Sequence, residues 1–236
     1  MARAVVFDLF HTLVNPEAHM PEGYSYRESL IELLVANAKD FLRFWDSGYE
    51  ERETTPIDLV DLVDRYQSGV GRPALTDGQR RLVDQWFGVG KDESLRSPDP
   101  ELVDLVRRVG ERGPVGVLSN CHERETRAWP ESPLAVVVSV MVRSCDIGVM
   151  KPAGATYRIV LAELGADGPD CVYVGNGGGD ELAGASVAGF GAVIHMNAFD
   201  SVNGVVGPAE QARRRAQADH GAASVAELAE LLLDVV

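Results

Sequence analysis

One acidic residue stands where proteins of mixed helices and strands place reactive groups. Asp8 directly follows Ala4-Val5-Val6-Phe7, a short apolar run typical of a strand that is buried on both faces. Open α/β sheets bind ligands at the carboxyl ends of their strands, so the Asp8 carboxylate is predicted to face a ligand. There it could attack an electrophilic centre and form an ester, which divides one difficult hydrolysis into two easier steps. Thr12, four residues further on, is assigned to the same catalytic group.

Polar residues follow other predicted strands as well. Ser119 and Asn120 end the second strand, and Lys151 lies in the loop before a predicted helix. We expect the Ser119 hydroxyl, the Lys151 ammonium and the backbone amides of residues 9–12 to hold the anionic part of a substrate where charge develops. The positive charge of Lys151 also favours the ionised form of Asp8. Together these groups predict nucleophilic catalysis at one edge of a sheet.

Strand and helix patterns alternate along most of the chain, and this alternation must position those residues. Apolar runs predict strands at residues 4–7, 115–118, 135–140, 171–174 and 191–196, with helices at 100–110, 153–164 and 180–188. Strands that alternate with helices indicate an α/β fold with a doubly wound parallel sheet.

A long helical insertion interrupts the alternation after the first strand. Amphipathic patterns predict helices at residues 24–45, 56–68 and 76–87. We therefore predict an all-helical cap domain at 15–95, and a catalytic core formed by 1–14 and 96–236. A second interruption, 198–223, is polar and is predicted to be a surface linker with a short helix. The last helix is predicted to start at Ser224, which forms a capping box with Glu227.

Charge and cysteine content restrict the partners and the compartment. The formal net charge of −14 argues against binding to nucleic acid or to an anionic membrane surface, so a small-molecule substrate is expected. The three widely spaced cysteines form neither a disulfide framework nor a zinc signature. The chain starts as a buried strand without a signal peptide, and no apolar run has membrane length. We expect a cytoplasmic protein, either a monomer or a homodimer.

Four sequence fragments resemble, in order, the motifs of haloacid dehalogenase (HAD) superfamily hydrolases that carry a helical cap of the C1 type. They are FDLFHTL at residues 7–13, LSN ending at Asn120, SxxxGxxKP at 144–152 and VYVGNGGGDELAGA at 172–185. The resemblance covers nearly the whole chain, and four fragments in this order are far more specific than any one alone. It implies a Rossmann-like core and hydrolysis through an ester on Asp8.

The resemblance also implies a role for individual residues. The expected catalytic residues are Asp8, Thr12, Ser119 and Lys151, and the expected substrate contacts are Leu9, Phe10, His11 and Asn120. A Mg²⁺ site would be formed by Asp8, the Phe10 carbonyl, Asn176 and Asp180. Of the two neighbouring acids, Asp180 is the expected ligand, whereas Glu181 is expected only to begin a helix, where a negative charge is favourable.

Two positions depart from the pattern of the phosphatases in this superfamily. Those enzymes carry a second aspartate two residues after the nucleophile, where this chain has Phe10. Loss of such an acid/base typically costs about 10²- to 10⁴-fold in rate, and His11 is a neighbouring candidate to replace it. Asn176 stands where the phosphatases place a magnesium-binding aspartate, so it offers an oxygen without charge and weakens the expected metal site.

Three functions are consistent with these residues. The first is a phosphatase of a small phosphorylated metabolite. The second is a hydrolase like the superfamily's 2-haloacid dehalogenases, which need neither acid nor metal and commonly have an aromatic residue at the position of Phe10. Those enzymes usually have asparagine where this chain has Gly178, and they use a cap arginine that could be Arg27, Arg43 or neither. The third is a catalytically impaired binding protein.

Overall fold

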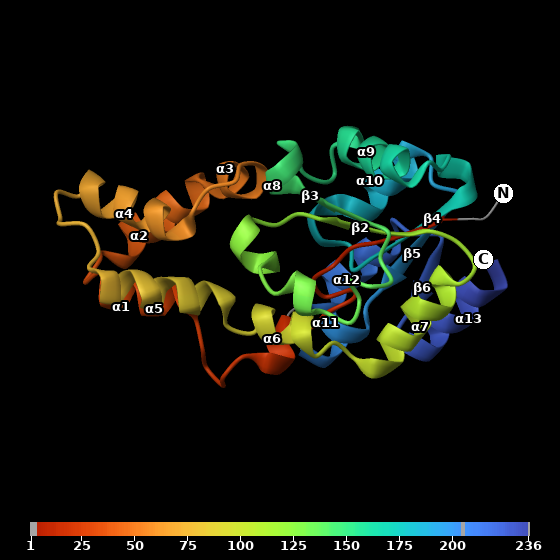
Figure 1. Ribbon diagram of the computed structural model, residues 1–236, viewed down its shortest axis with the longest axis horizontal. Coiled ribbons are helices and arrows are strands. Elements are labelled where there is room, and N and C mark those ends of the chain that lie inside the picture. The colour runs from red at the N-terminus through yellow and green to blue at the C-terminus, as the bar shows by residue number, and fades with distance from the viewer. Residues whose placement is uncertain (1–3, 204–205, 236) are drawn as a thin grey trace.

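The computed structural model describes residues 4–203 and 206–235 and contains one parallel sheet (Figure 1). Its six strands follow the order β3-β2-β1-β4-β5-β6, and every neighbouring pair is parallel. The strands are β1 (Ala4–Phe7), β2 (Val115–Ser119), β3 (Val140–Arg143), β4 (Cys171–Gly175), β5 (Ala192–Met196) and β6 (His220–Ala222). This topology confirms the predicted α/β fold and places β1 between β2 and β4, with its carboxyl end at the centre of one sheet edge.

Helices cover both faces of this sheet because successive side chains of a strand point in opposite directions (Figure 1). Val5 and Phe7 pack in one buried cluster with α7 (Pro100–Gly110) and α13 (Val225–Val235). Ala4 and Val6 pack in a second cluster on the opposite face, with α9 (Gly154–Leu164) and α10 (Glu181–Ala188). β1 is therefore held from both sides, and the residue that follows it has a well-defined position.

A separate group of helices lies beside the sheet (Figure 1). It consists of α1 (Tyr26–Leu33), α2 (Ala38–Ser47), α3 (Tyr49–Thr54), α4 (Leu59–Gly69) and α5 (Asp77–Gly88). Apolar side chains of α1, α2, α4 and α5 form a third buried cluster, distinct from the two clusters of the sheet. We keep the boundaries 1–14 with 96–236 for the core and 15–95 for the cap as a proposal; residues 1–3, 204–205 and 236 of that core lie outside the described residues.

Short elements complete the described chain. They are η1 (Pro16–His19), α6 (Lys91–Arg96), η2 (Glu123–Thr126), η3 (Trp129–Glu131), α8 (Ser144–Ile147), η4 (Gly168–Asp170), η5 (Gly178–Asp180), α11 (Ala198–Asn203) and α12 (Pro208–Arg215). Every helix in the described ranges is too short or too polar to cross a membrane.

The predicted strand at 135–140 was wrong. Turns closed by backbone hydrogen bonds occupy the segment, such as Val137 N to Leu134 O at 3.0 Å, and the third strand begins only at Val140. The side chain of Val136 is 89% exposed, whereas Val137 and Val138 pack against the core from the turn. An apolar run can thus cover the core without forming a strand, and this ambiguity is intrinsic to short apolar segments.

Two other element predictions also need correction. The predicted helix 24–45 is two helices, because Val35 adopts a left-handed backbone conformation with φ +46° and Asn37 caps a new helix by accepting from the Asp40 amide. The predicted linker 198–223 contains α11, α12 and the edge strand β6, whose three residues are too few to give a recognisable pattern.

Candidate active site

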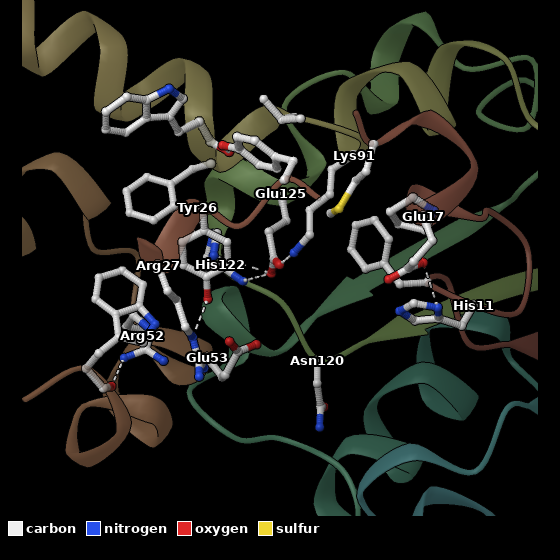
Figure 2. A pocket seen from close by; sticks show the side chains of 18 of the residues that line it. His11, Glu17, Tyr26, Arg27, Arg52, Glu53, Lys91, Asn120, His122 and Glu125 are labelled. Atoms are coloured by element: carbon white, nitrogen blue, oxygen red, sulfur yellow. Dashed lines mark hydrogen bonds and ion pairs between the residues drawn. The ribbon is translucent and has the colours of Figure 1, made fainter. Parts of the chain in front are cut away.

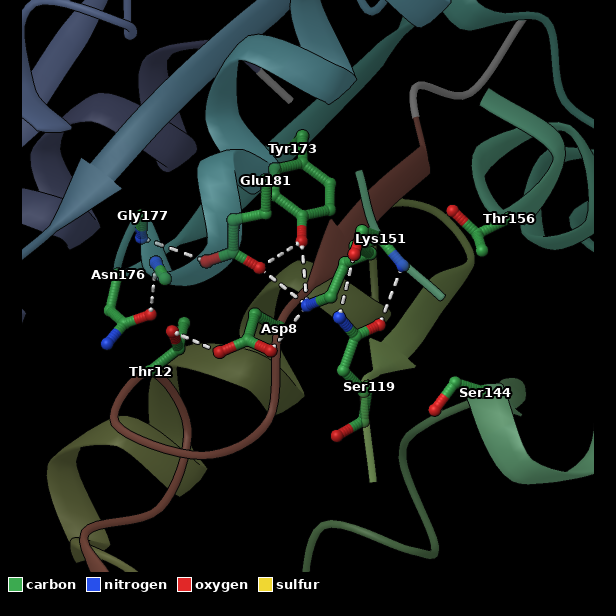
Figure 3. A network of polar contacts seen from close by, with 12 residues as sticks. Asp8, Thr12, Ser119, Ser144, Lys151, Thr156, Tyr173, Asn176, Gly177 and Glu181 are labelled. Carbon is green, nitrogen blue, oxygen red and sulfur yellow. Dashed lines mark hydrogen bonds and ion pairs between the residues drawn. The ribbon is translucent and has the colours of Figure 1, made fainter. Parts of the chain in front are cut away.

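Asp8 lies at the carboxyl end of β1 and is almost fully buried, with 7% of its surface exposed. Each carboxylate oxygen accepts one hydrogen bond (Figure 3). Lys151 Nζ donates to Asp8 Oδ1 at 2.6 Å, and Thr12 Oγ1 donates to Asp8 Oδ2 at 2.9 Å. The structure therefore brings together three of the four predicted catalytic residues by direct contact and fixes the orientation of the Asp8 carboxylate.

Lys151 is the electrostatic centre of this group. Its ammonium also donates to Glu181 Oε2 at 2.5 Å and to the Tyr173 hydroxyl at 3.2 Å (Figure 3). Burial disfavours the charge, but the carboxylates of Asp8 and Glu181 outweigh this effect and hold the pKa of Lys151 above its usual value. The two buried acids therefore favour the protonated form of Lys151.

Asn120 holds the backbone of Lys151 in place. Asn120 Nδ2 donates to the Lys151 carbonyl at 2.9 Å, and the Lys151 amide donates to Asn120 Oδ1 at 2.8 Å. These two bonds connect the loop that carries Lys151 to the end of β2. Asn120 also lines the cavity of Asp8, and its contact with a substrate stays a prediction.

The structure reverses the roles predicted for the two acids of the fourth motif. Glu181 is 1% exposed, and besides Lys151 it accepts hydrogen bonds from the Tyr173 hydroxyl and from the Gly177 amide. Asp180 instead points to the surface, where Arg213 and Gln217 donate to its carboxylate.

A sequence signal for Glu181 did exist. Gly184 and Ala185 lie three and four residues later and are buried, and residues at this spacing share one face of a helix. That periodicity places Glu181, rather than Asp180, on the buried face of α10.

The predicted magnesium ligands are engaged elsewhere. Asn176 Oδ1 accepts from the Gly178 amide at 3.1 Å, and Asn176 Nδ2 faces Asp200 at 3.3 Å. Both oxygens of Asp8 are already used by Lys151 and Thr12, and Asp180 is turned away. Within the described ranges, no three His, Cys, Asp or Glu residues are grouped as metal ligands. Asp180 does not fit the predicted site, because Arg213 and Gln217 hold its carboxylate away from the cavity that Asp8, Phe10 and Asn176 line. Asp180 as a ligand is therefore corrected, and binding of Mg²⁺ by the remaining residues stays a prediction.

Sequence reasoning missed Asp200 and Arg214, which lie beside Asn176 and line the same cavity as Asp8. Asp200 is 2% exposed and pairs with Arg214 at 3.0 Å, and Arg214 Nη1 also donates to the Asn176 carbonyl at 3.1 Å. Both residues come from the segment predicted to be a linker. The composition of residues 198–223 did not indicate that this segment packs against the edge of the sheet where Asp8 lies.

Ser119 is positioned to contact a ligand. Its hydroxyl is buried and has no hydrogen-bond partner in the described part of the chain, although the residue lines the cavity of Asp8. The Ser119 hydroxyl is thus available to hydrogen-bond a substrate, as the sequence predicted. A buried hydroxyl without a hydrogen-bond partner is unfavourable, and a ligand could supply that partner.

The turn after Asp8 provides fewer free amides than predicted. The His11 amide donates to the Val14 carbonyl, and the Thr12 amide donates to the Leu9 carbonyl. Within the described ranges, no protein group accepts from the amides of Leu9 and Phe10, so these two remain available to an anion. The Leu9 side chain packs in the core, so only its backbone can contact a substrate.

His11 lies on the wall of the same cavity, in a left-handed backbone conformation with φ +63°. Its Nδ1 pairs with Glu17 at 3.1 Å. Burial disfavours the imidazolium, but Glu17, Asp200 and Asp8 outweigh that effect and raise the pKa of His11 above its usual value.

A second cavity is lined largely by residues of the helical group, among them Tyr26, Arg27 and Arg52 (Figure 2). It encloses about 310 Å³, which is the size of a small-molecule site. Its lining shares Phe10, His11, Tyr49 and Asn120 with the cavity of Asp8. A substrate could therefore reach from Asp8 into the helical group.

Two arginines of the helical group line this second cavity. They are Arg27, one of the two predicted candidates, and Arg52, which the sequence analysis did not consider. Arg43, the other candidate, is absent from the lining and pairs with Asp40 at an exposed position.

Comparisons with known proteins agree with this architecture. A family model described as haloacid dehalogenase-like hydrolase matches residues 2–189. Among solved structures, the chain resembles an L-2-haloacid dehalogenase from Xanthobacter autotrophicus with a TM-score of 0.60, 16% identity and 100% of each chain covered. It resembles a 2-haloacid dehalogenase from Pseudomonas syringae pv. Tomato DC3000 with a TM-score of 0.62, 21% identity and 100% of each chain covered.

A phosphatase is equally similar. A HAD phosphatase from Thermococcus onnurineus has a TM-score of 0.62 and 17% identity, with 98% of this chain and 97% of that chain covered. At these identities the likeness establishes the fold alone. A sequence comparison with curated proteins found no significant match.

Proposed function

This chain belongs to the haloacid dehalogenase-like hydrolase family, and from that premise we propose that it hydrolyses a small anionic substrate through an ester on Asp8, with a leaving group that departs as an anion. One observation carries the proposal. Asp8, Thr12 and Lys151 are in direct contact, whereas Asn176 and Asp180, the residues expected to hold a metal, are engaged elsewhere. This combination favours the dehalogenase-type reaction over the phosphatase that we placed first on sequence grounds.

The proposed reaction has two steps. An oxygen of Asp8 attacks the carbon that carries a halogen, so a carbon–oxygen bond forms while the carbon–halogen bond breaks and halide leaves with the electron pair. Water then attacks the ester carbonyl carbon of Asp8 and releases the hydroxy acid, with the net release of one proton to solvent. Because halide needs no proton to leave, Phe10 at the position of a general acid has no cost for the first step.

The protein groups around Asp8 would support both steps. Lys151 and Thr12 hold the carboxylate in one orientation, which limits the entropy lost on reaction. The Ser119 hydroxyl and the amides of Leu9 and Phe10 are available to the negative charge that develops in hydrolysis of the ester.

Halide release tests the proposal. Purified protein is incubated with an α-chloro carboxylic acid, and chloride release is expected to be unchanged when a chelator is added. Asp8→Asn should reduce the rate by about 10³-fold or more, because the ester cannot form. Asp180→Asn, on the exposed neighbour in the fourth motif, is the matched control and should retain activity. In a single turnover in heavy-oxygen water, the label should appear in the Asp8 peptide and not in the product.

Other outcomes contradict the proposal. Halide release that requires added Mg²⁺, or label found first in the product, would exclude this route. If the folded protein released neither chloride nor phosphate from panels of substrates, the result would support the third function, a catalytically impaired binding protein.

A phosphatase remains the second candidate because of His11. Its raised pKa and its place in the cavity of Asp8 would allow the imidazolium to protonate the leaving oxygen while Asp8 attacks phosphorus. Since the pKa is raised, the active cationic form persists above the usual histidine value and is lost as pH rises through the shifted one.

Leaving-group dependence tests this second candidate. His11→Gln should slow release of phosphate from an alkyl phosphate by about 10²-fold, and should affect p-nitrophenyl phosphate much less, because nitrophenolate leaves without a proton. The variant should also lose the decline of rate at alkaline pH. Equal losses on both substrates would show that His11 is not the acid.

A further inference from the structure

Glu53 is a buried acid that receives no hydrogen bond from the described residues. It lies on α3, is 7% exposed, and lines the second cavity. Throughout the described residues, no group donates a hydrogen bond to its carboxylate or forms an ion pair with it, and no dashed line reaches it in Figure 2. The oxygens of Glu53 are not among the fully buried polar atoms that lack a partner, so the carboxylate is open to the cavity. A ligand that displaces water from this carboxylate has to supply a hydrogen-bond donor in its place.

The cavity walls around Glu53 are aromatic. Trp45 and Phe87 are stacked with ring centroids 5.4 Å apart, and Tyr26 packs against both, at 5.9 and 5.6 Å. All three rings line the cavity together with Glu53. Such walls favour a planar apolar body, because flat rings bury large areas against one another.

The protein's own cations already occupy the aromatic faces. The Arg52 guanidinium lies 4.3 Å from the centroid of Trp45, and Arg27 lies 5.9 Å from that of Tyr26. Lys91, which pairs with Glu125, lies 5.1 Å from the ring of Phe10. A cationic ligand would be repelled by these charges, although aromatic walls beside a carboxylate otherwise favour ammonium groups. No cation lies over the Phe87 ring among the described residues, so an uncharged ring can pack there.

A neutral donor avoids this repulsion. Burial raises the pKa of Glu53, and the charges of Lys91 and Arg52 counteract part of that shift. A hydroxyl that donates to the carboxylate would stabilise its ionised form further, and hydrogen bonds to an ionised acceptor are about twice as strong as neutral ones.

We propose that Glu53 accepts a hydrogen bond from a hydroxyl group on an aromatic ring of the substrate, so that the substrate class is that of phenolic acids. The ring lies against Tyr26 and Phe87, and the reacting end extends past Phe10 toward Asp8 along the shared wall of the two cavities. The assignment of the reacting end rests on the proposed function; the binding of the ring does not.

Binding of three unreactive probes tests the proposal by calorimetry. The probes are hydrocinnamate, its para-hydroxyl derivative and its para-aminomethyl derivative, all of which carry a carboxylate and no leaving group. The full-length protein should bind the hydroxyl probe about 10- to 100-fold more tightly than hydrocinnamate, as expected for a hydrogen bond to a charged group. The ammonium probe should bind more weakly than the hydroxyl probe.

Variants test whether Glu53 causes the preference for the hydroxyl probe over hydrocinnamate. Glu53→Met, which keeps the length of the side chain and removes the acceptor, should abolish the preference, and Glu53→Gln should reduce it. Glu50→Met, at an exposed position of the same helix, is the matched control and should retain it. Circular dichroism and thermal melting verify that each variant is folded.

The result of the binding test can be distinguished from the result of the halide-release test. The preference should persist in Asp8→Asn, which cannot form an ester, so a failure of halide release leaves this test intact. No binding of the hydroxyl probe, equal binding of the hydroxyl and unsubstituted probes, tightest binding of the ammonium probe, or a preference retained in Glu53→Met would each overturn the proposal.

Discussion

Lys151 joins two carboxylates that would otherwise repel each other. Asp8 and Glu181 both lie within hydrogen-bonding distance of its ammonium, at 2.6 and 2.5 Å, and all three groups are buried. In such a site the loss of one acid leaves a buried charge less well compensated, which is costly because desolvation is no longer offset. The role of Glu181 is therefore to position Lys151 and, through it, Asp8.

Neighbouring acids provide a direct comparison. Glu181→Gln should lower the free energy of unfolding by about 3 kcal/mol, because it removes one charge from a buried ion pair. Asp180→Asn, one residue earlier but on the surface, should leave the stability close to that of the wild type. Urea denaturation of both variants measures the difference. A larger loss in Asp180→Asn than in Glu181→Gln would contradict the burial seen here.

At the scale of elements, α10 approaches the Lys151 loop closely because Gly184 has no side chain. A Cβ at this position would lie 2.5 Å from Tyr157 Oη and 2.9 Å from Pro152 Cβ. Tyr157 in turn donates to the Glu181 carbonyl at 2.8 Å. The glycine thus permits the packing that brings Glu181 to Lys151.

Two glycine substitutions in helices separate packing from helix propensity. Gly184→Ala should destabilise the protein by about 1 to 3 kcal/mol, because the new methyl group overpacks the contact between α10 and the loop. Gly78→Ala, in α5 with no heavy atom near the added Cβ, should stabilise it by up to about 1 kcal/mol, since alanine is the better helix former. Chemical denaturation checks both signs, and a stabilising Gly184→Ala would refute the packing argument.

At the scale of the whole molecule, the two cavities lie where the helical group meets the sheet edge. Arg124, beyond the end of β2, pairs with Asp92 through two hydrogen bonds at 2.7 and 2.9 Å and donates to the Asp84 carbonyl of α5 at 3.1 Å. Arg127 also pairs with Asp84, at 2.8 Å. The contacts with Asp84 attach α5 to the segment that follows β2, and Tyr49 of the helical group lines the cavity of Asp8. Closure of this group over the cavity would exclude water from the reaction.

The state of assembly and the surroundings of the protein stay predictions. The net charge of −14 still argues for a small-molecule partner over nucleic acid or an anionic membrane surface. A monomer or homodimer in the cytoplasm is the expectation from the sequence.

The sequence alone determined the sheet class and the meeting of Asp8, Thr12 and Lys151. Buried strands and turn residues have local patterns, and the carboxyl ends of parallel strands meet at one edge whatever the details of packing. Ser119 was found for the same reason.

Tertiary structure alone decided which atoms of those residues remain free. Helix periodicity could indicate that Glu181 is buried, but only the packing of α10 brings its carboxylate to Lys151, and the turn at Gly178 uses the oxygen of Asn176. The lack of a hydrogen-bond donor to Glu53 among the described residues likewise depends on the elements that surround the cavity. Local sequence periodicity records which side of an element is buried, but the contacts of a buried polar group depend on segments far away in the chain.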